Sequence, residues 1–126
     1  MLANKDAVAT VAVTDLDRAK EFYGETLGLE EGDGMEDMVA TYRSGGSTIL
    51  VYKSDHAGTN EATAVTWNVD DVDREVADLK AKGVTFEHYD FPDAKLEGDV
   101  HVFQGNLRNA WFKDPDGNIL AIVTVN

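Results

Sequence analysis

The feature that most constrains the fold is an internal repeat that covers nearly the whole chain. Residues around the first predicted helix recur 56 positions later, with Val13, Asp15, Asp17 and Arg18 matching Val69, Asp71, Asp73 and Arg74. The last hairpins also match, Ile49-Leu50 against Ile119-Leu120, at an offset of 70. Such a repeat indicates two copies of one supersecondary unit. We therefore predict an α+β fold in which residues 1–126 form a single domain of two tandem β-α-β-β-β modules, about 1–56 and 60–126.

Each module is expected to begin with an apolar strand that leads into a helix. Residues 7–14 are small and β-branched, which is typical of a buried strand. Asp15 or Thr14 can cap the helix that follows, and Gly28 can end it. Further strands are expected near 29–33, 37–43 and 47–53, the last two joined by a Gly-Gly turn. The second module repeats this order with a strand at 62–69, a helix at 71–82 and strands near 84–90, 109–113 and 118–125.

The second module also contains extra chain. Because the offset grows from 56 to 70, about 14 additional residues precede its last hairpin, between Tyr89 and Asn109. This 89–109 stretch holds Pro92, Gly98 and Gly105 and reads as a long loop. A loop of that length in a compact domain is often a lid or a binding loop. A surface excursion without function is the open alternative.

Two stretches of the sequence resemble the vicinal oxygen chelate superfamily, which includes glyoxalases, extradiol dioxygenases and bleomycin-resistance proteins. They are VTDLDRAKEFY at 13–23, followed by Leu27-Gly28-Leu29, and AWFKDPDGNIL at 110–120. The resemblance implies that the two modules pair, with curved sheets around a cleft and the helices outside. It also implies a homodimer.

Catalytic members of that superfamily hold a divalent metal with one His or Glu from each of four strands. The resemblance places those ligand positions at Val8, Val51, Ala64 and Ala121. Aliphatic side chains have no lone pair to donate to a metal. We therefore predict no metal site and no cofactor, and metal-dependent glyoxalase or dioxygenase activity is not expected.

Strand alternation predicts which other side chains line the cleft. Thr10 shares a face with Val8, while Thr66 and Asn68 share one with Ala64. Through the Gly-Gly turn, Tyr42 is expected on the face of Val51. His101 is a candidate general base, and Arg108 could bind a carboxylate. A bulge in the turn at 114–117 would shift the facing by one residue, so either Trp111 or Phe112 can face the cleft. The predicted ligand-binding residues are Thr10, Tyr42, Thr66, Asn68, His101, Arg108 and Trp111, although packing or exposure to solvent would also explain each of them.

The charge balance limits the kinds of partner that the protein can bind. Asp and Glu number 24 against 11 Lys and Arg, for a net charge of -13, which argues against nucleic acid and anionic membrane surfaces. The chain has no cysteine, so a disulfide framework and a thiol nucleophile are excluded. The first residues lack a signal-peptide pattern, and no apolar run is long enough to span a bilayer. We expect a cytoplasmic protein.

Three functional hypotheses follow from these observations. The first is metal-independent binding or sequestration of a small organic molecule, for which a cationic ligand would suit the acidic balance. The second is a metal-independent lyase or isomerase with His101 or Tyr42 as the proton-transfer group. The third is an interaction module whose pocket is vestigial.

Overall fold

The computed structural model describes residues 1–33 and 38–124. Positions 37 and 125, the expected ends of two strands, lie outside the described residues. The chain divides into two compact units, 1–59 and 60–126, each of which is described by itself. Together they form the α+β fold with two sheets that the sequence predicts. Within the described ranges, no helix is long and apolar enough to cross a membrane.

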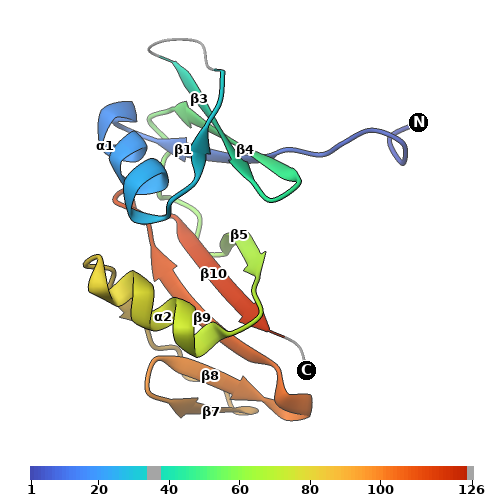
Figure 1. Cartoon of the computed structure of the whole chain (residues 1–126), viewed down its shortest axis with the longest axis vertical. Coiled ribbons are helices and arrows are strands. Elements are labelled where there is room, and N and C mark those ends of the chain that lie inside the picture. The colour runs from blue at the N-terminus through green and yellow to red at the C-terminus, as the bar shows by residue number, and fades with distance from the viewer. Residues whose placement is uncertain (34–37, 125–126) are drawn as a thin grey trace. The chain divides into compact units, whose positions relative to one another are not determined.

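Unit 1 is a four-stranded sheet covered by one helical segment (Figure 1). The strand order is β1-β4-β3-β2, with β1 parallel to β4 and the other pairs antiparallel. Residues 1–8 are exposed and extend away from the start of β1 (Figure 1). The elements are β1 (Ala9–Val13), α1 (Leu16–Lys20), a π-helical continuation η1 (Glu21–Thr26), β2 (Glu30–Glu31), β3 (Val39–Ser44) and β4 (Ser47–Lys53).

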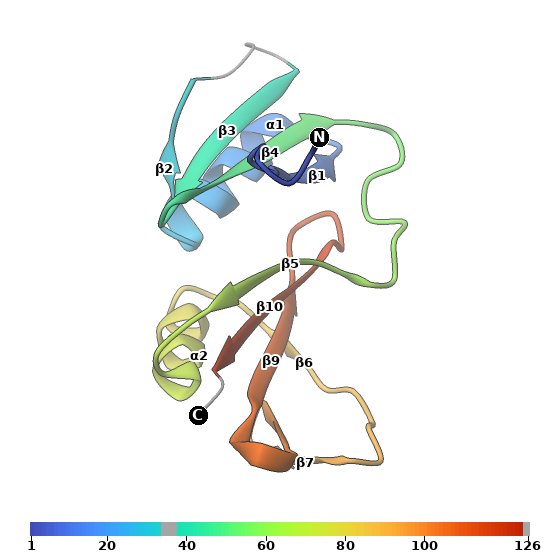
Figure 2. The same ribbon diagram turned by 90° about the vertical axis from the view of Figure 1, so that its right-hand side faces the viewer.

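Unit 2 is a six-stranded sheet with one helix on its face (Figure 2). The path runs β5-β10-β9-β8-β7, with β5 parallel to β10. Both β6 and β8 pair with β9, at different ends of it. The elements are β5 (Thr63–Asn68), α2 (Val72–Ala81), β6 (Phe86–Glu87), β7 (Ala94–Glu97), β8 (Val100–Phe103), a 3-10 turn η2 (Gln104–Asn106), β9 (Arg108–Lys113) and β10 (Ile119–Thr124).

Both helices begin where the repeated sequence predicts. A carboxylate oxygen of Asp15 accepts hydrogen bonds from the backbone N–H groups of Asp17, at 2.9 Å, and Arg18, at 3.2 Å. Asp71 caps α2 in the same way, accepting from the N–H of Arg74 at 3.1 Å. These bonds satisfy amide groups that the first helical turn leaves without partners.

The extra stretch at 89–109 is largely a β-hairpin rather than the expected loop. Strands β7 and β8 pair antiparallel through a turn at 98–99, where Gly98 has a φ of 64°. Strand β8 then pairs with β9, so the hairpin widens the sheet of unit 2. In the sequence, the alternation of apolar residues in Val100-His101-Val102 indicates a strand, but the neighbouring Pro and Gly residues favour a loop.

Each unit buries its core between sheet and helix. In unit 1, Val11 pairs with Val51, and both are almost fully buried on the side of the sheet that faces α1. In unit 2, Phe112 stacks on Trp67 with ring centroids 6.5 Å apart and contacts Phe86 at 5.5 Å. The apolar faces predicted from strand periodicity therefore pack against helices.

The register of the last hairpins corrects one sequence-based correspondence. Tyr42 pairs with Ile49 in unit 1, and Phe112 pairs with Leu120 in unit 2. Ile49 therefore corresponds to Leu120, and the offset for the last strand is 71 rather than 70. The lengths of the two turns explain the difference. Two residues, Gly45 and Gly46, lie between the paired Ser44 and Ser47 of the first hairpin. Three residues, 115–117, lie between the hydrogen-bonded Asp114 and Asn118 of the second.

Candidate functional site

The side of each sheet that faces away from its helix is the surface on which the sequence placed a ligand. In unit 1, Thr10 pairs with Leu50 and is exposed on that side. Paired residues of adjacent strands project to the same face of a sheet. Val51, paired with Val11, therefore lies on the opposite, α1-facing side. The expectation that Val51 shares a face with Thr10 is wrong, because the last-strand offset is one residue larger than assumed.

Tyr42 moves to the core for the same reason. It pairs with Ile49, is only 1% exposed and lies 6.1 Å from the ring of Tyr23. Burial and, next, the nearby carboxylate of Glu31 raise its pKa to about 12. The expectation that Tyr42 shares a face with Thr10 is therefore also wrong, and Tyr42 packs beneath η1.

In unit 2 the side away from α2 carries five rings, which we call the aromatic cluster. Trp111 lies in the middle of it, because its ring centroid is 4.9 Å from that of His101, 5.4 Å from Phe91 and 5.5 Å from Tyr89. Phe103 joins through Phe91 at 5.5 Å. Most of these pairs meet edge to face or tilted, which is the favourable geometry for aromatic contacts.

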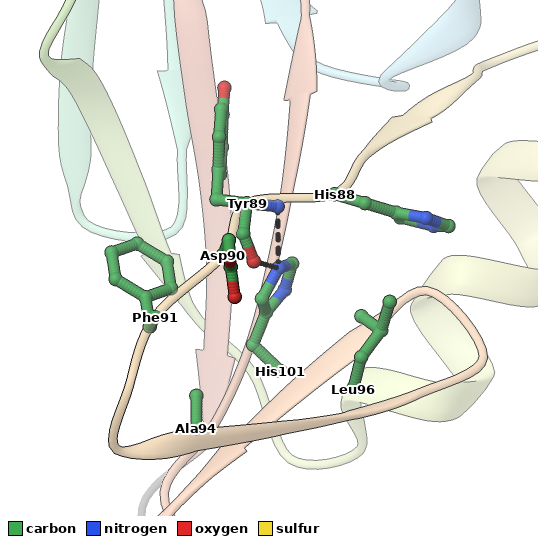
Figure 3. A pocket seen from close by; sticks show the side chains of 7 residues that line it. All are labelled: His88, Tyr89, Asp90, Phe91, Ala94, Leu96 and His101. Atoms are coloured by element: carbon green, nitrogen blue, oxygen red, sulfur yellow. Dashed lines mark hydrogen bonds between the residues drawn. The ribbon is translucent and has the colours of Figure 1, made fainter.

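A pocket of about 330 Å³ opens beside the aromatic cluster (Figure 3). Its rim is apolar and accessible, since Phe91 is 36% exposed and Leu96 is 43% exposed. Asp90 contributes the one carboxylate among the lining residues. The pocket is lined by His88, Tyr89, Asp90, Phe91, Ala94, Leu96 and His101.

His101 is the most buried polar residue of the pocket, with 1% of its surface exposed. Its Nε2 accepts a hydrogen bond from the backbone N–H of Tyr89 at 3.0 Å, and the backbone carbonyl of Tyr89 lies 3.2 Å away (Figure 3). Its Nδ1 is buried and has no hydrogen-bond partner among the residues that the structure describes. Buried polar groups in native proteins are rarely left in this state.

Three further polar side-chain atoms of unit 2 share this condition among the described residues, and one of them is Nε of Arg108. The side-chain oxygen of Asn109 and the hydroxyl of Tyr89 are buried without a partner in the described part of the chain. Asn109 is the cross-strand neighbour of His101, so the two side chains lie on one face. Burial and, next, the charge of Glu87 raise the pKa of Tyr89, so its hydroxyl stays protonated at neutral pH.

The outer edge of the pocket carries a charged group of residues that the sequence did not single out. The Nε2 of His88 lies 2.7 Å from one carboxylate oxygen of Asp99, and Lys80 donates to the other, also at 2.7 Å. Hydrogen bonds from Lys80 and from His88 lower the pKa of Asp99. Asp99 sits in the turn of the β7–β8 hairpin, and only recognising that hairpin would have brought it next to His88.

The comparisons with known proteins decide the family. Residues 6–122 match the sequence profile of the Glyoxalase/Bleomycin resistance protein/Dioxygenase superfamily. The chain belongs to this superfamily. No curated protein sequence matches the chain.

Several solved structures share the fold of this chain. Lactoylglutathione lyase from Agrobacterium tumefaciens is 17% identical, with 96% of this chain and 93% of that chain covered and a TM-score of 0.74. TnmS3, an antibiotic binding protein from Streptomyces sp. CB03234, is 24% identical over 100% of this chain and 99% of its own, with a TM-score of 0.68. A glyoxalase/bleomycin resistance protein from the same Streptomyces is 26% identical, covering 94% and 98%, with a TM-score of 0.62.

The metal that catalytic superfamily members carry does not fit the side chains of this chain. With the corrected register the four equivalent positions are Val8, Leu50, Ala64 and Ala121. Ala121 pairs with Thr66 on the side away from α2, and Ala64 lies at an irregularity of β5. None of the four side chains has a donor atom. In the described ranges, no group of three or more His, Cys, Asp or Glu could hold a metal ion.

The predicted ligand-binding residues thus divide by face. His101 and Trp111 come together in the aromatic cluster, and Trp111 donates from Nε1 to the hydroxyl of Thr63 at 3.1 Å. Thr66 and Asn68 lie exposed on the same side of this sheet. Arg108 lies on the other side, where its guanidinium is 2.9 Å from Asp73 of α2 and 3.8 Å from Glu97. It holds α2 and β7 to the sheet instead of facing the pocket.

Proposed function

We propose that this protein binds and sequesters a small organic molecule that carries a planar aromatic group, without using a metal. The observation that carries the proposal is the pocket of about 330 Å³ beside the aromatic cluster, with the buried His101 in its wall. Ligand sites in proteins are typically concave and apolar, with a few placed polar groups. Ring faces and edges in the wall favour a flat, aromatic ligand.

The charges around the pocket favour a neutral or cationic ligand. Asp90 lines the pocket, and the net charge of the chain is -13. A field of this sign raises the local concentration of cations and repels anions. The similarity of fold to TnmS3, an antibiotic binding protein, supports an antibiotic-like ligand.

Two probes test the binding proposal. Calorimetric titration with doxorubicin and with bleomycin, which are cationic and contain planar aromatic groups, is expected to show binding to the wild-type protein. NMR titration with indane, an uncharged bicyclic fragment, is expected to shift the amide signals of Phe91, Leu96 and His101. The proposal fails if indane leaves these signals unmoved and neither antibiotic binds.

We also propose that the protein acts without a bound metal and as a homodimer. Elemental mass spectrometry on protein purified without chelators or a histidine tag is expected to find no stoichiometric divalent metal. Light scattering after size exclusion is expected to give twice the mass of 13.8 kDa. One metal per chain would contradict the first statement, and a monomeric mass would contradict the second.

One observation favours metal-independent proton transfer as a second candidate function. His88 lines the pocket and pairs with Asp99 at 2.7 Å, and a carboxylate that orients an imidazole is a common arrangement for a general base. The test is exchange of the α-protons of 1-indanone in D2O, followed by NMR. The wild-type protein is expected to accelerate the exchange, and His88→Ala to abolish that acceleration. An exchange rate equal to that in buffer would remove this candidate.

A further inference from the structure

Building on the proposed binding function, we propose that His101 selects ligands that carry a hydrogen-bond acceptor, through the N–H group at its Nδ1. The ligand class is then a planar aromatic molecule with a carbonyl oxygen or an equivalent acceptor. His101 acts as a specificity-determining donor rather than as a general base.

The first step is the tautomer of His101, which we assign from hydrogen-bond geometry. The backbone N–H of Tyr89 can only donate, and it points at Nε2 from 3.0 Å. Nε2 must therefore offer its lone pair. In a neutral imidazole the proton then resides on Nδ1. The contact from Nε2 to the Tyr89 carbonyl, at 3.2 Å, is longer and would leave the Tyr89 N–H without an acceptor.

The second step is the burial of that donor. His101 is 1% exposed, and its Nδ1 has no partner among the described residues. A buried donor without an acceptor is costly, so an occupant of the pocket that supplies an acceptor is stabilised relative to one that does not. The same cost penalises any ligand that fills the space with carbon only.

The third step concerns what surrounds the donor. The ring centroids of Trp111 and Phe91 lie 4.9 and 5.8 Å from that of His101, and Phe91 also lines the pocket, so a ligand that reaches His101 meets an aromatic ring. Asn109 pairs with His101 across the strands, and its buried side-chain oxygen also has no partner in the described chain. An acceptor that stands next to a donor on the ligand would satisfy both side chains. A single water molecule could do the same, and the experiment must separate the two.

The tautomer is tested first, on the wild-type protein without a ligand. Nitrogen-15 NMR of protein labelled at histidine distinguishes a protonated Nδ1 from a protonated Nε2 by their chemical shifts. We expect one histidine, assigned to His101 by its loss in His101→Phe, to carry its proton on Nδ1. An Nε2-protonated ring would overturn the proposal whatever the ligand data show.

The ligand preference is tested with 1-indanone and indane, which share a bicyclic frame and differ by one carbonyl oxygen. Dissociation constants come from the NMR titrations. A net hydrogen bond predicts that the wild-type protein binds 1-indanone about 2- to 10-fold more tightly than indane. His101→Phe keeps an aromatic ring but no donor, so we expect this ratio to fall to about one.

His101→Asn supplies the rescue, because the amide nitrogen of asparagine occupies nearly the position of Nδ1. It is expected to restore the preference for 1-indanone, and His56→Gln, which removes an imidazole from unit 1, is the matched control that should leave it unchanged. His101→Asn also shows that the effect belongs to the donor if His101→Phe proves unstable.

The outcomes separate the two proposals. If indane and 1-indanone bind equally to the wild-type protein, the selection by His101 is wrong and the binding function stands. If 1-indanone binds without moving the Nδ1 signal, that nitrogen is held by a bound water only and the selection is again wrong. If neither fragment binds, the selection by His101 is wrong, and the binding function falls with it only if neither antibiotic binds.

Discussion

The two units repeat the same order of strand, helix and final hairpin, and a clear difference between them lies on the side of the sheet away from the helix. Toward the helix they match closely, because Tyr42 and Phe112 occupy equivalent positions and both are 1% exposed. Away from the helix they diverge. Thr41 of unit 1 pairs with Leu50, whereas the equivalent Trp111 of unit 2 pairs with Ala121 and lies at the centre of the aromatic cluster.

The extra hairpin explains this divergence. Strand β8 supplies His101 and Phe103, and β7 supplies Ala94 and Leu96, so most of the pocket wall comes from chain that unit 1 lacks or from the segment leading into it. The fold is therefore conserved between the units by their helix-facing cores. Part of the aromatic cluster of unit 2 lies on strands at the edge of its sheet, where a hairpin can pair without disturbing that core.

The largest expected effect concerns the equivalent cores. Tyr42→Ala and Phe112→Ala each remove a fully buried ring, and we expect each to lower the free energy of unfolding by about 3–5 kcal/mol. Urea unfolding followed by circular dichroism measures both. If one of the two substitutions costs less than about 1 kcal/mol, the helix-facing cores are not equivalent and the comparison breaks.

Alkaline pH should distinguish the same two positions, because Tyr42 can ionise and Phe112 cannot. Folding raises the pKa of Tyr42 from its ordinary value of 10.0 to about 12, so the folded state holds its proton more tightly than the unfolded state. The resulting stability is complete below pH 10 and is lost as the pH rises toward 12. For a group this buried the loss amounts to about 2–3 kcal/mol.

Tyr42→Phe is expected to remove this loss, which urea unfolding at pH 8 and at pH 11.5 would measure. The variant is needed because the pKa of Tyr89 in unit 2 is also raised, so a pH profile of the wild-type protein alone would mix the two. Tyr89→Phe is the matched control. An equal alkaline loss in the wild-type protein and in Tyr42→Phe would show that Tyr42 is not its source.

The sequence predicted the duplicated fold but not the site, and the reasons are physical. Capping by Asp15 and Asp71 and the alternation of β1 and β5 are local properties, so the helices and first strands could be predicted directly. The face of Tyr42 was inferred from the match with the last hairpin of unit 2, whose turn is one residue longer, and a shift of one reverses every side chain of a strand. The contact between the rings of His101 and Trp111 depends on the β7–β8 hairpin, which the nearby Pro and Gly residues made hard to predict.

Removing the central ring of the aromatic cluster should weaken binding by loosening Tyr89, Phe91 and His101, which line the pocket and pack against Trp111. Trp111 contacts three rings at 4.9–5.5 Å, and we expect Trp111→Ala to weaken the binding of indane about 10- to 100-fold. The control is Thr41→Ala at the equivalent position of unit 1, which should leave the dissociation constant unchanged. A loss of binding in Thr41→Ala would show that unit 1 also contributes to the site.

The smallest effect expected is at the helix caps, where the two units should again behave alike. Asp15 accepts two backbone hydrogen bonds and Asp71 accepts one, so Asp15→Ala is expected to cost somewhat more within the usual range of about 0.5–2 kcal/mol. Asparagine keeps the acceptor and removes the charge, so Asp15→Asn and Asp71→Asn should retain most of that stability in urea unfolding. If asparagine is as damaging as alanine, the carboxylate stabilises the helix through its charge at the positive end of the helix dipole, and the shared Asp marks an electrostatic requirement of the module rather than a hydrogen bond.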